Sequence, residues 1–342
     1  MRYTTSVLTA VALIGGFTLS GLAQAGTVFD SVKQKGFVQC GLSTGVPGYS
    51  APDSKGNWTG LDVDTCRAIA GAIFGDTSKI KVTPLNSQQR FTALQSGEVD
   101  VLIRYSTFTQ SRDTTLGLTS TAVNYYDGQG FMVPNKLGVK SAKELDGATV
   151  CLQSGTTTEL NLADYFRANK MTYKPVVVDN PDEAIRSFTS GRCDVYTTDK
   201  APLASARITM IERPDDYLIL PEVISKEPTG PMVRQGDKEF ENLVKWTVYG
   251  LIEAEELGVT SKNVDEMRKS PSPAVQRLLG VQPGVGKNMG VRDDWVVTVV
   301  RSIGNYGEIF DRNMGKDSPL KLDRGLNALW KDGGLMYAWP MR

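Results

Sequence analysis

Apolar residues recur along this chain in blocks whose spacing predicts strands and helices in alternation. The run at 37–42 is typical of a buried strand, and segment 63–74 repeats its apolar residues near the 3.6-residue period of a helix that buries one face. A strand at 80–85, a short helix at 90–96 and a strand at 101–105 follow. This alternation predicts an α/β fold with parallel strands.

The same order of elements occurs twice. At 96–101 a helix ends in glycine and a strand begins directly after an aspartate, and 190–195 repeats this after a predicted helix at 182–189. Each half also begins with a strand that contains a cysteine, Cys40 in the first and Cys151 in the second. The repetition predicts two similarly built lobes.

Two glycine-containing segments, 125–131 and 227–233, are predicted to cross between the lobes, because glycine absorbs changes in backbone torsion at a hinge. An amphipathic helix is expected at 240–257. The resulting division is lobe 1 (first part) at 26–126, lobe 2 at 127–227, the return crossing with the second part of lobe 1 at 228–285, and a helical C-terminal extension at 286–342.

The extension is predicted to contain two or three helices. We expect its aromatic residues to pack in a core rather than contact a ligand; they are Trp295, Tyr306, Phe310 and Trp330.

The first residues resemble a secretory signal peptide. Arg2 precedes an uncharged stretch at 7–22, and Ala23-Gln24-Ala25 forms a small-residue cleavage pattern, which predicts cleavage after Ala25 and a periplasmic mature protein. An uncleaved membrane anchor is the alternative. No cysteine follows the cleavage position directly, which argues against a lipid-anchored protein.

Charge and composition narrow the function classes. The 38 basic and 38 acidic residues cancel, so no basic field for nucleic acid is expected. The chain contains no histidine, which removes histidine-based metal sites and Ser/His/Asp or Cys/His catalysis. Segment 41–45 fits a nucleophile-elbow pattern, but Pro47-Gly48 follows where a helix would be needed. No metal or cofactor is expected.

Four cysteines in an exported chain favour disulfides. The pairs Cys40–Cys66 and Cys151–Cys193 keep each bridge inside one lobe, whereas either other pairing would tie the lobes together. Four buried free thiols are the alternative.

Polar residues follow three predicted strands. Thr107 and Arg112 lie in a loop after the strand at 101–105, where a hydroxyl and a guanidinium suit a carboxylate, although a solvated pair is the alternative. Thr156 and Thr157 lie where a helix begins and suit an anion, with a plain helix cap as the alternative. Asp199 follows a further strand and suits an ammonium, or is a turn residue. Together these groups match the shared part of an α-amino acid.

The same motifs resemble those of the polar amino-acid-binding proteins of ABC importers. The similarity covers 37–258 and rests on 60–64, 94–100, the Thr107–Arg112 spacing and 154–157. Segments 156–161, 191–196 and 304–310 are most similar to the general L-amino-acid-binding branch. The resemblance implies a type II periplasmic binding fold that closes on its ligand and delivers it to membrane permease subunits, with a monomer expected.

The resemblance also implies residue roles. Arg112 and Thr107 match positions that hold the α-carboxylate, Thr156 and Thr157 match positions that meet it from lobe 2, and Asp199 matches the acceptor of the α-ammonium. Tyr105 falls where the family offers a backbone or side-chain acceptor, and Gln153, at the end of the strand before Thr156, is a further candidate for ligand binding. The side-chain pocket departs from the aromatic clamp of many relatives: one loop offers Tyr49 and another Ser87, Gln88 and Arg90, which suits broad specificity.

Three other functions stay open. One is a periplasmic dehydratase or lyase on the same scaffold, with Glu159 or Asp199 as the acid. The second is a receptor for an amino-acid derivative such as an opine, or for a small peptide. The third is a ligand-binding partner of a signalling receptor.

Overall fold

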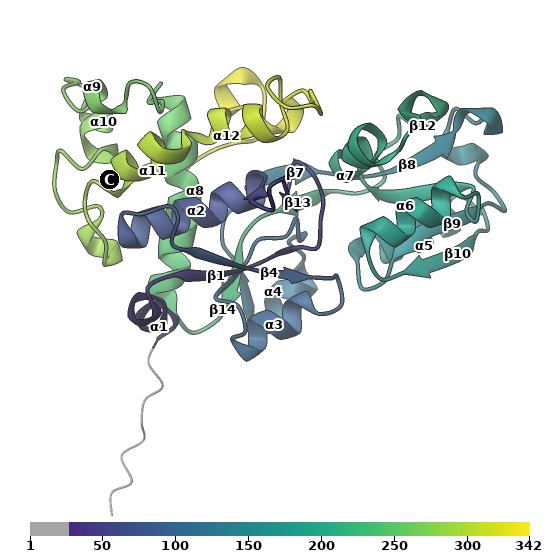
Figure 1. Cartoon of the computed structure of the whole chain (residues 1–342), viewed down its shortest axis with the longest axis horizontal. Helices are drawn as coiled ribbons and strands as arrows, with labels where there is room; N and C mark the ends of the chain where they lie inside the picture. Colours follow the sequence, from purple (N-terminus) through teal and green to yellow (C-terminus); the bar gives the residue numbers. More distant parts are fainter. Residues whose placement is uncertain (1–26) are drawn as a thin grey trace, which may run out of the picture.

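The computed structural model describes residues 27–342, and the predicted signal peptide lies outside them. Two five-stranded sheets form two lobes (Figure 1). The sheet of lobe 1 runs in the order β4 (Ile80–Leu85), β1 (Val38–Ser43), β5 (Val101–Leu102), β14 (Met232–Arg234), β6 (Leu118–Ser120). The sheet of lobe 2 runs β10 (Lys174–Val178), β9 (Thr149–Gln153), β11 (Val195–Asp199), β8 (Gln129–Pro134), β12 (Tyr217–Ile219).

The predicted duplication is confirmed in the strand pairing. In lobe 1, β1 pairs in parallel with β4 and β5, and in lobe 2, β9 pairs in parallel with β10 and β11. In both sheets the remaining pairs are antiparallel. The carboxyl ends of the parallel strands are where ligands bind in open α/β sheets.

Two strands connect the lobes. β7 (Tyr125–Asp127) leads into lobe 2, β13 (Glu227–Thr229) leads back, and the two pair in antiparallel register as a two-stranded sheet. The predicted pair of crossings is therefore confirmed, while the residue boundaries assigned to the lobes stay a prediction.

Helices cover both sheets. In lobe 1 these are α1 (Val28–Lys35), α2 (Leu61–Phe74), α3 (Arg90–Ser96), α4 (Gln110–Thr115) and α8 (Lys238–Glu256), and a short hairpin of β2 (Ala51–Pro52) and β3 (Trp58–Thr59) precedes α2. In lobe 2 they are α5 (Thr157–Ala168), α6 (Pro181–Thr189) and α7 (Lys200–Ser205). No helix within residues 27–342 is both long and apolar enough to cross a bilayer.

The C-terminal extension packs on lobe 1. Its helices are α11 (Trp295–Ile303) and α12 (Tyr306–Asn313), which contact α2 and α8. Two short helices, α9 (Val264–Met267) and α10 (Pro273–Leu278), precede the extension in the second part of lobe 1. Trp295, Tyr306 and Phe310 are buried as expected. The expectation for Trp330 is wrong: it is 50% exposed, because its indole reaches the surface and donates to Glu256.

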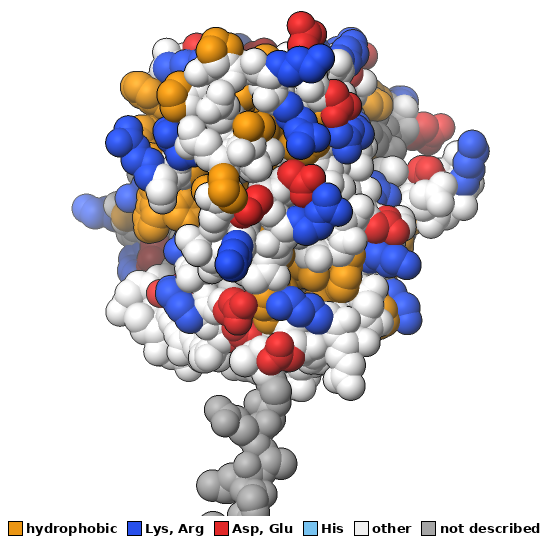
Figure 2. All heavy atoms as spheres, turned by 90° about the vertical axis from the view of Figure 1, so that its left-hand side faces the viewer, with side chains coloured by type: hydrophobic (Ala, Val, Ile, Leu, Met, Phe, Trp, Pro, Cys, Tyr) orange, Lys and Arg blue, Asp and Glu red, His pale blue; other side chains and the backbone are white. Residues whose placement is uncertain are grey.

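The extension also contacts a crossing strand. The Asn327 amide accepts from the Tyr126 N–H at 2.7 Å and donates to the Tyr126 carbonyl at 3.0 Å. Figure 2 views the end of the molecule that carries α9 and α10, where basic and acidic side chains are interspersed without a continuous block of one charge.

The strand predicted at 101–105 is shorter than expected. β5 ends at Leu102, and Tyr105, three residues further on, has a left-handed backbone with φ of 34°. The Tyr105 N–H donates to the Asp62 carboxylate at 3.0 Å, and Asp62 is fully buried in the first turn of α2. A non-glycine residue in this region is strained and is kept there by its surroundings.

Both predicted disulfides are present, Cys40–Cys66 and Cys151–Cys193. The first closes a loop between residues 26 apart in sequence and joins β1 to α2, and the second closes one between residues 42 apart in lobe 2.

Replacing both cysteines of a bridge with serine is expected to lower the free energy of unfolding. The restriction of the unfolded chain predicts a loss of about 3.5 kcal/mol for Cys40/Cys66 and about 4 kcal/mol for the longer Cys151/Cys193 loop. Urea unfolding of the oxidised wild type and the two double variants measures this. Midpoints that match the wild type would contradict a stabilising role.

The buried Asp62 carboxyl predicts a pH dependence of stability. Burial raises its pKa from 3.8 to about 7. The folded state therefore keeps a proton that the unfolded chain releases, and this contribution to stability is present below pH 4 and is lost as pH rises towards 7, by on the order of 4 kcal/mol. Asp62→Asn keeps an acceptor for the Tyr105 N–H but cannot titrate, so the free energy of unfolding of this variant is expected to change less between pH 4 and pH 7. Parallel stability–pH curves for the two proteins would contradict the assignment.

Candidate functional site

A narrow cavity of about 20 Å³ lies between the lobes, beside the carboxyl ends of their parallel strands. Both lobes line it. Lobe 1 contributes Ser87, Arg90, Arg104, Tyr105 and Thr107, and lobe 2 contributes Gln153, Thr156, Thr157, Thr158, Thr198 and Asp199.

The lobes contact each other around this cavity. Gln88 donates to the Ser154 hydroxyl at 2.8 Å, and Arg90 Nη2 donates to the Gly155 carbonyl at 3.2 Å. On another side of the interface, the Ser205 hydroxyl of lobe 2 donates to the Pro47 carbonyl at 2.7 Å. The structure therefore represents the closed arrangement of the lobes.

Most residues singled out in the sequence meet at this cavity. Those that line it are Arg90, Tyr105, Thr107, Gln153, Thr156, Thr157 and Asp199. Arg112 and Tyr49 do not line it. Tyr49 is buried behind Tyr105, with ring centres 5.1 Å apart, and its hydroxyl donates to Asp127.

Arg112 lies beside the cavity on the loop that follows β5. Its Nη1 donates to the Thr107 carbonyl at 2.8 Å, and its guanidinium carbon lies 4.9 Å from the centre of the Phe91 ring. Burial lowers its pKa to about 10, and the nearby Glu227 carboxylate opposes that change. Arg112 is therefore positively charged at neutral pH.

Sequence reasoning missed Glu227, which begins the return strand β13. Its side chain is buried and accepts hydrogen bonds from Thr107 of lobe 1 and from Thr157 and Asn161 of lobe 2, the latter two at 3.0 and 2.7 Å. Ser225 donates to the same carboxylate at 2.6 Å. The hydroxyls of Thr107 and Thr157, expected to face a ligand carboxylate, thus meet a carboxylate of the protein itself. Glu227 directly precedes the Pro-Thr-Gly of the return crossing, and nothing in this local sequence identifies it as a residue of the cleft.

Asp199 ends β11 with its carboxyl group buried at the cavity wall. Its pKa is raised well above the usual range by burial and then by the negative charges of Asp127 and Glu227. Burial also raises the pKa of Asp127, to about 6. A cation placed against Asp199 reverses this shift, because opposite charge favours the ionised carboxylate.

Arg104 is a second residue that sequence reasoning missed. It is fully buried, its Nε donates to the Leu85 carbonyl at 3.0 Å, and it lines the cavity beside Arg90. Burial lowers the pKa of Arg90 well below its usual range, and the positive charges of Arg104 and Arg112 add to this effect. The sequence did contain a signal for Arg104, because it is the one charged residue in the apolar run 101–105. A buried arginine needs a partner, so its presence there indicates a polar site.

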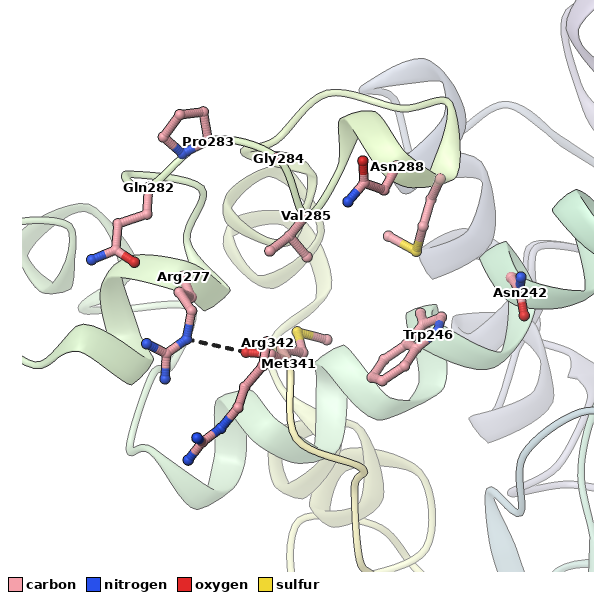
Figure 3. Close-up of a pocket in the computed structure, with 11 residues that line it drawn as sticks. Asn242, Trp246, Arg277, Gln282, Pro283, Gly284, Val285, Asn288, Met341 and Arg342 are labelled. Atoms are coloured by element: carbon pink, nitrogen blue, oxygen red, sulfur yellow. Dashed lines mark hydrogen bonds between the residues drawn. The ribbon is translucent and has the colours of Figure 1, made fainter.

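A second hollow lies at the far end of lobe 1, between α8, α10 and the C-terminal residues (Figure 3). Trp246, Val285 and Met341 line it together with Arg277, whose Nε donates to the Met341 carbonyl at 3.1 Å. Its wall has no acidic side chain among the described residues, so it lacks the opposed charges of the cleft. Within residues 27–342 no group of three or more Cys, Asp or Glu side chains is arranged to bind a metal ion.

Comparisons with known proteins show which proteins this chain resembles. The general L-amino acid-binding periplasmic protein AapJ of Rhizobium johnstonii is 56% identical over 335 residues, covering 97% of this chain and 98% of the relative. The glutamate/glutamine/aspartate/asparagine-binding protein BztA of Rhodobacter capsulatus is 52% identical over 325 residues, covering 95% and 96%.

A solved structure is also similar. The ABC transporter/periplasmic binding protein from Brucella ovis, with glutathione bound, superposes with a TM-score of 0.91 at 56% identity, covering 93% of this chain and all of that one. Residues 38–263 match the bacterial extracellular solute-binding proteins of family 3, about two-thirds of the chain. The chain belongs to that family of bacterial extracellular solute-binding proteins.

Proposed function

We propose that this protein binds a free L-amino acid between its lobes and delivers it to the permease subunits of an ABC importer. The observation that carries the proposal is the opposition of charges across one cavity: Arg90 and Arg104 of lobe 1 line it opposite Asp199 of lobe 2. Arg112 lies beside this wall, close enough for its charge to act on Arg90. An α-amino acid has a carboxylate and an ammonium on the same α-carbon, which matches this arrangement. The two relatives named above, AapJ and BztA, are described as amino-acid-binding proteins.

In this proposal Arg112 and the start of α5 hold the ligand carboxylate. Helix α5 begins after Thr156 without a side-chain cap, so the N–H groups of its first turn have no partner within the helix. The hydroxyls of Thr107 and Thr157 donate to Glu227, and each has one proton. Each of these hydroxyls can therefore donate either to Glu227 or to a ligand, but not to both at once.

Asp199 takes the ligand ammonium in the same scheme. Because Asp199 and α5 belong to lobe 2 and Arg112 belongs to lobe 1, a ligand reaches all of them only when the lobes are closed. This difference in contacts shifts the equilibrium towards the closed form.

The wider setting follows from the family and the sequence. We infer export with cleavage after Ala25, a monomer that meets the permease, and no cofactor. We also infer that the protein is not an enzyme. A solved relative 25% identical is described as an ancestral amino acid-binding protein and a precursor of cyclohexadienyl dehydratase, and the raised pKa of Asp199 is a property of a general acid. A bound ammonium accounts for the same residue without catalysis.

Arg112→Ala is expected to weaken binding of every amino acid by about 100-fold or more, because it removes a largely buried charge from the part that all amino acids share. Isothermal titration calorimetry with several amino acids measures the loss. Arg213→Ala is the matched control, since Arg213 is exposed in lobe 2. Retained affinity in Arg112→Ala would reject the role of this residue.

Asp199→Asn is expected to weaken amino acids by about 100-fold while affecting the matching 2-hydroxy acids far less, because only the amino acid has an ammonium for Asp199 to bind. Competition binding with each amino acid and its hydroxy acid measures the difference. An equal loss for both ligands would count against Asp199 as the ammonium acceptor.

A further inference from the structure

A groove of about 820 Å³ lies behind the two crossing strands, and both lobes line it. Side chains alternate between the two faces of a strand, so the sheet of β7 and β13 has one face towards the ligand cavity and one away from it. Tyr126 and Pro228 are paired and line the groove. The carboxylate of the adjacent Glu227 accepts from Thr107 and Thr157 at the cavity. The groove and the cavity therefore lie on opposite sides of the hinge.

The C-terminal extension forms the lobe 1 wall of this groove and lies above β7 and β13 in Figure 1, whereas α4 and α5 lie below them. Leu326 and Leu335 form its tip: they are 54% and 48% exposed, and the Leu335 N–H donates to the Leu326 carbonyl at 2.8 Å. Arg324 holds the tip to lobe 1, because its guanidinium donates to both carboxylate oxygens of Glu255 in α8, at 2.9 and 3.1 Å. The tip therefore moves together with lobe 1.

Lobe 2 forms the opposite wall of the groove. Val223 is 56% exposed and lines it together with Lys200 and Lys226. The segment of Val223 is attached to lobe 2, since the Ile224 N–H donates to the Gln129 carbonyl in β8 at 3.0 Å. Exposed apolar side chains therefore line the groove from both lobes, on segments that are each held to their own lobe.

The extension also fixes the point at which the first crossing bends. Asn327 is 4% exposed, and its side-chain amide accepts from the Tyr126 N–H at 2.7 Å and donates to the Tyr126 carbonyl at 3.0 Å. Two residues further on, the Gly128 carbonyl accepts from the Lys200 N–H of lobe 2 at 2.9 Å. The backbone contacts thus change from lobe 1 to lobe 2 between Tyr126 and Gly128, which places the bend of the first crossing there.

We propose that the C-terminal extension sets the ligand affinity from behind the hinge. Asn327 acts as a positioning residue for the first crossing, and the tip at Leu326 acts as a stop for opening. A rotation about β7 and β13 that widens the cleft on one side narrows the groove on the other. This rotation brings Leu326 towards Val223, and their contact ends it. The inference rests on the proposed function for the identity of the ligand, but not for the movement of the lobes.

Such a stop changes the affinity without touching the ligand. The ligand contacts both lobes only in the closed form, so its apparent dissociation constant depends on the free energy of the closed form relative to the open forms. A larger side chain at the tip excludes the widest open forms and favours closure, whereas a smaller one admits them. The closed form itself is unaffected, because its groove of about 820 Å³ has room for a larger side chain.

Substitution in opposite directions at one position tests the stop. Calorimetry with an L-amino acid that the wild type binds is expected to show about threefold tighter binding for Leu326→Trp and about threefold weaker binding for Leu326→Ala. The same two substitutions at Leu137, a 42% exposed residue of lobe 2 outside the groove, are the matched controls. Affinity changes of the same direction in both Leu326 variants, or no change beyond that of the Leu137 variants, would overturn the stop.

Small-angle X-ray scattering measures the opening directly and needs no ligand. In the absence of ligand, the radius of gyration is expected to decrease in Leu326→Trp and to increase in Leu326→Ala, relative to the wild type. Equal radii for the three ligand-free proteins would contradict the inference. If no amino acid binds to any of them, the proposed function fails, while the scattering still decides on the stop.

Asn327→Ala tests the positioning role. This variant is expected to bind the amino acid about threefold more weakly and to have a larger radius of gyration without ligand, but the wild-type radius at saturating ligand. A lower unfolding temperature with unchanged affinity and unchanged ligand-free radius would reject this role, because it would show a purely structural contribution. If the variant fails to fold by circular dichroism, the two Leu326 variants decide the outcome.

Discussion

The carboxylate of Glu227 is the point at which the two lobes and the return crossing strand meet. It is 1% exposed, and it accepts hydrogen bonds from Thr107 of lobe 1 and from Thr157 and Asn161 of lobe 2. A buried carboxylate is stable only when such donors surround it, so the closed arrangement satisfies Glu227 and opening the lobes removes part of that set. The position of β13 and the closure of the cleft are therefore coupled through one side chain.

The remaining charges of the cleft are incompletely balanced by the protein. Arg90 and Arg104 have unpartnered N–H groups, and the pKa of Asp199 is raised by burial and by neighbouring carboxylates. A negatively charged group of a ligand would provide an acceptor for these N–H groups, and a positively charged group would lower the pKa of Asp199 again. Under the proposed function, the charges of the ligand complete the electrostatics of the cleft, and binding and closure are then expected to favour each other.

Local signals in the sequence predicted the elements well and the contacts between them poorly. The apolar period and the glycine stops located α2, α3 and β4, and the cysteine positions predicted both disulfides. The left-handed backbone of Tyr105 was not predictable, because the Tyr105 N–H donates to Asp62, which lies 43 residues away in the sequence. Glu227 was missed for the same reason: its partners Thr107 and Thr157 lie 120 and 70 residues away.

Identification of the ligand that the protein carries when it is purified tests the central claim most directly. The protein is prepared without added ligand, denatured, and the released small molecules are identified by mass spectrometry. The account predicts a free L-amino acid in an amount comparable to the protein. A different solute at that level, together with failure of every L-amino acid to stabilise the emptied protein against heating, would contradict it.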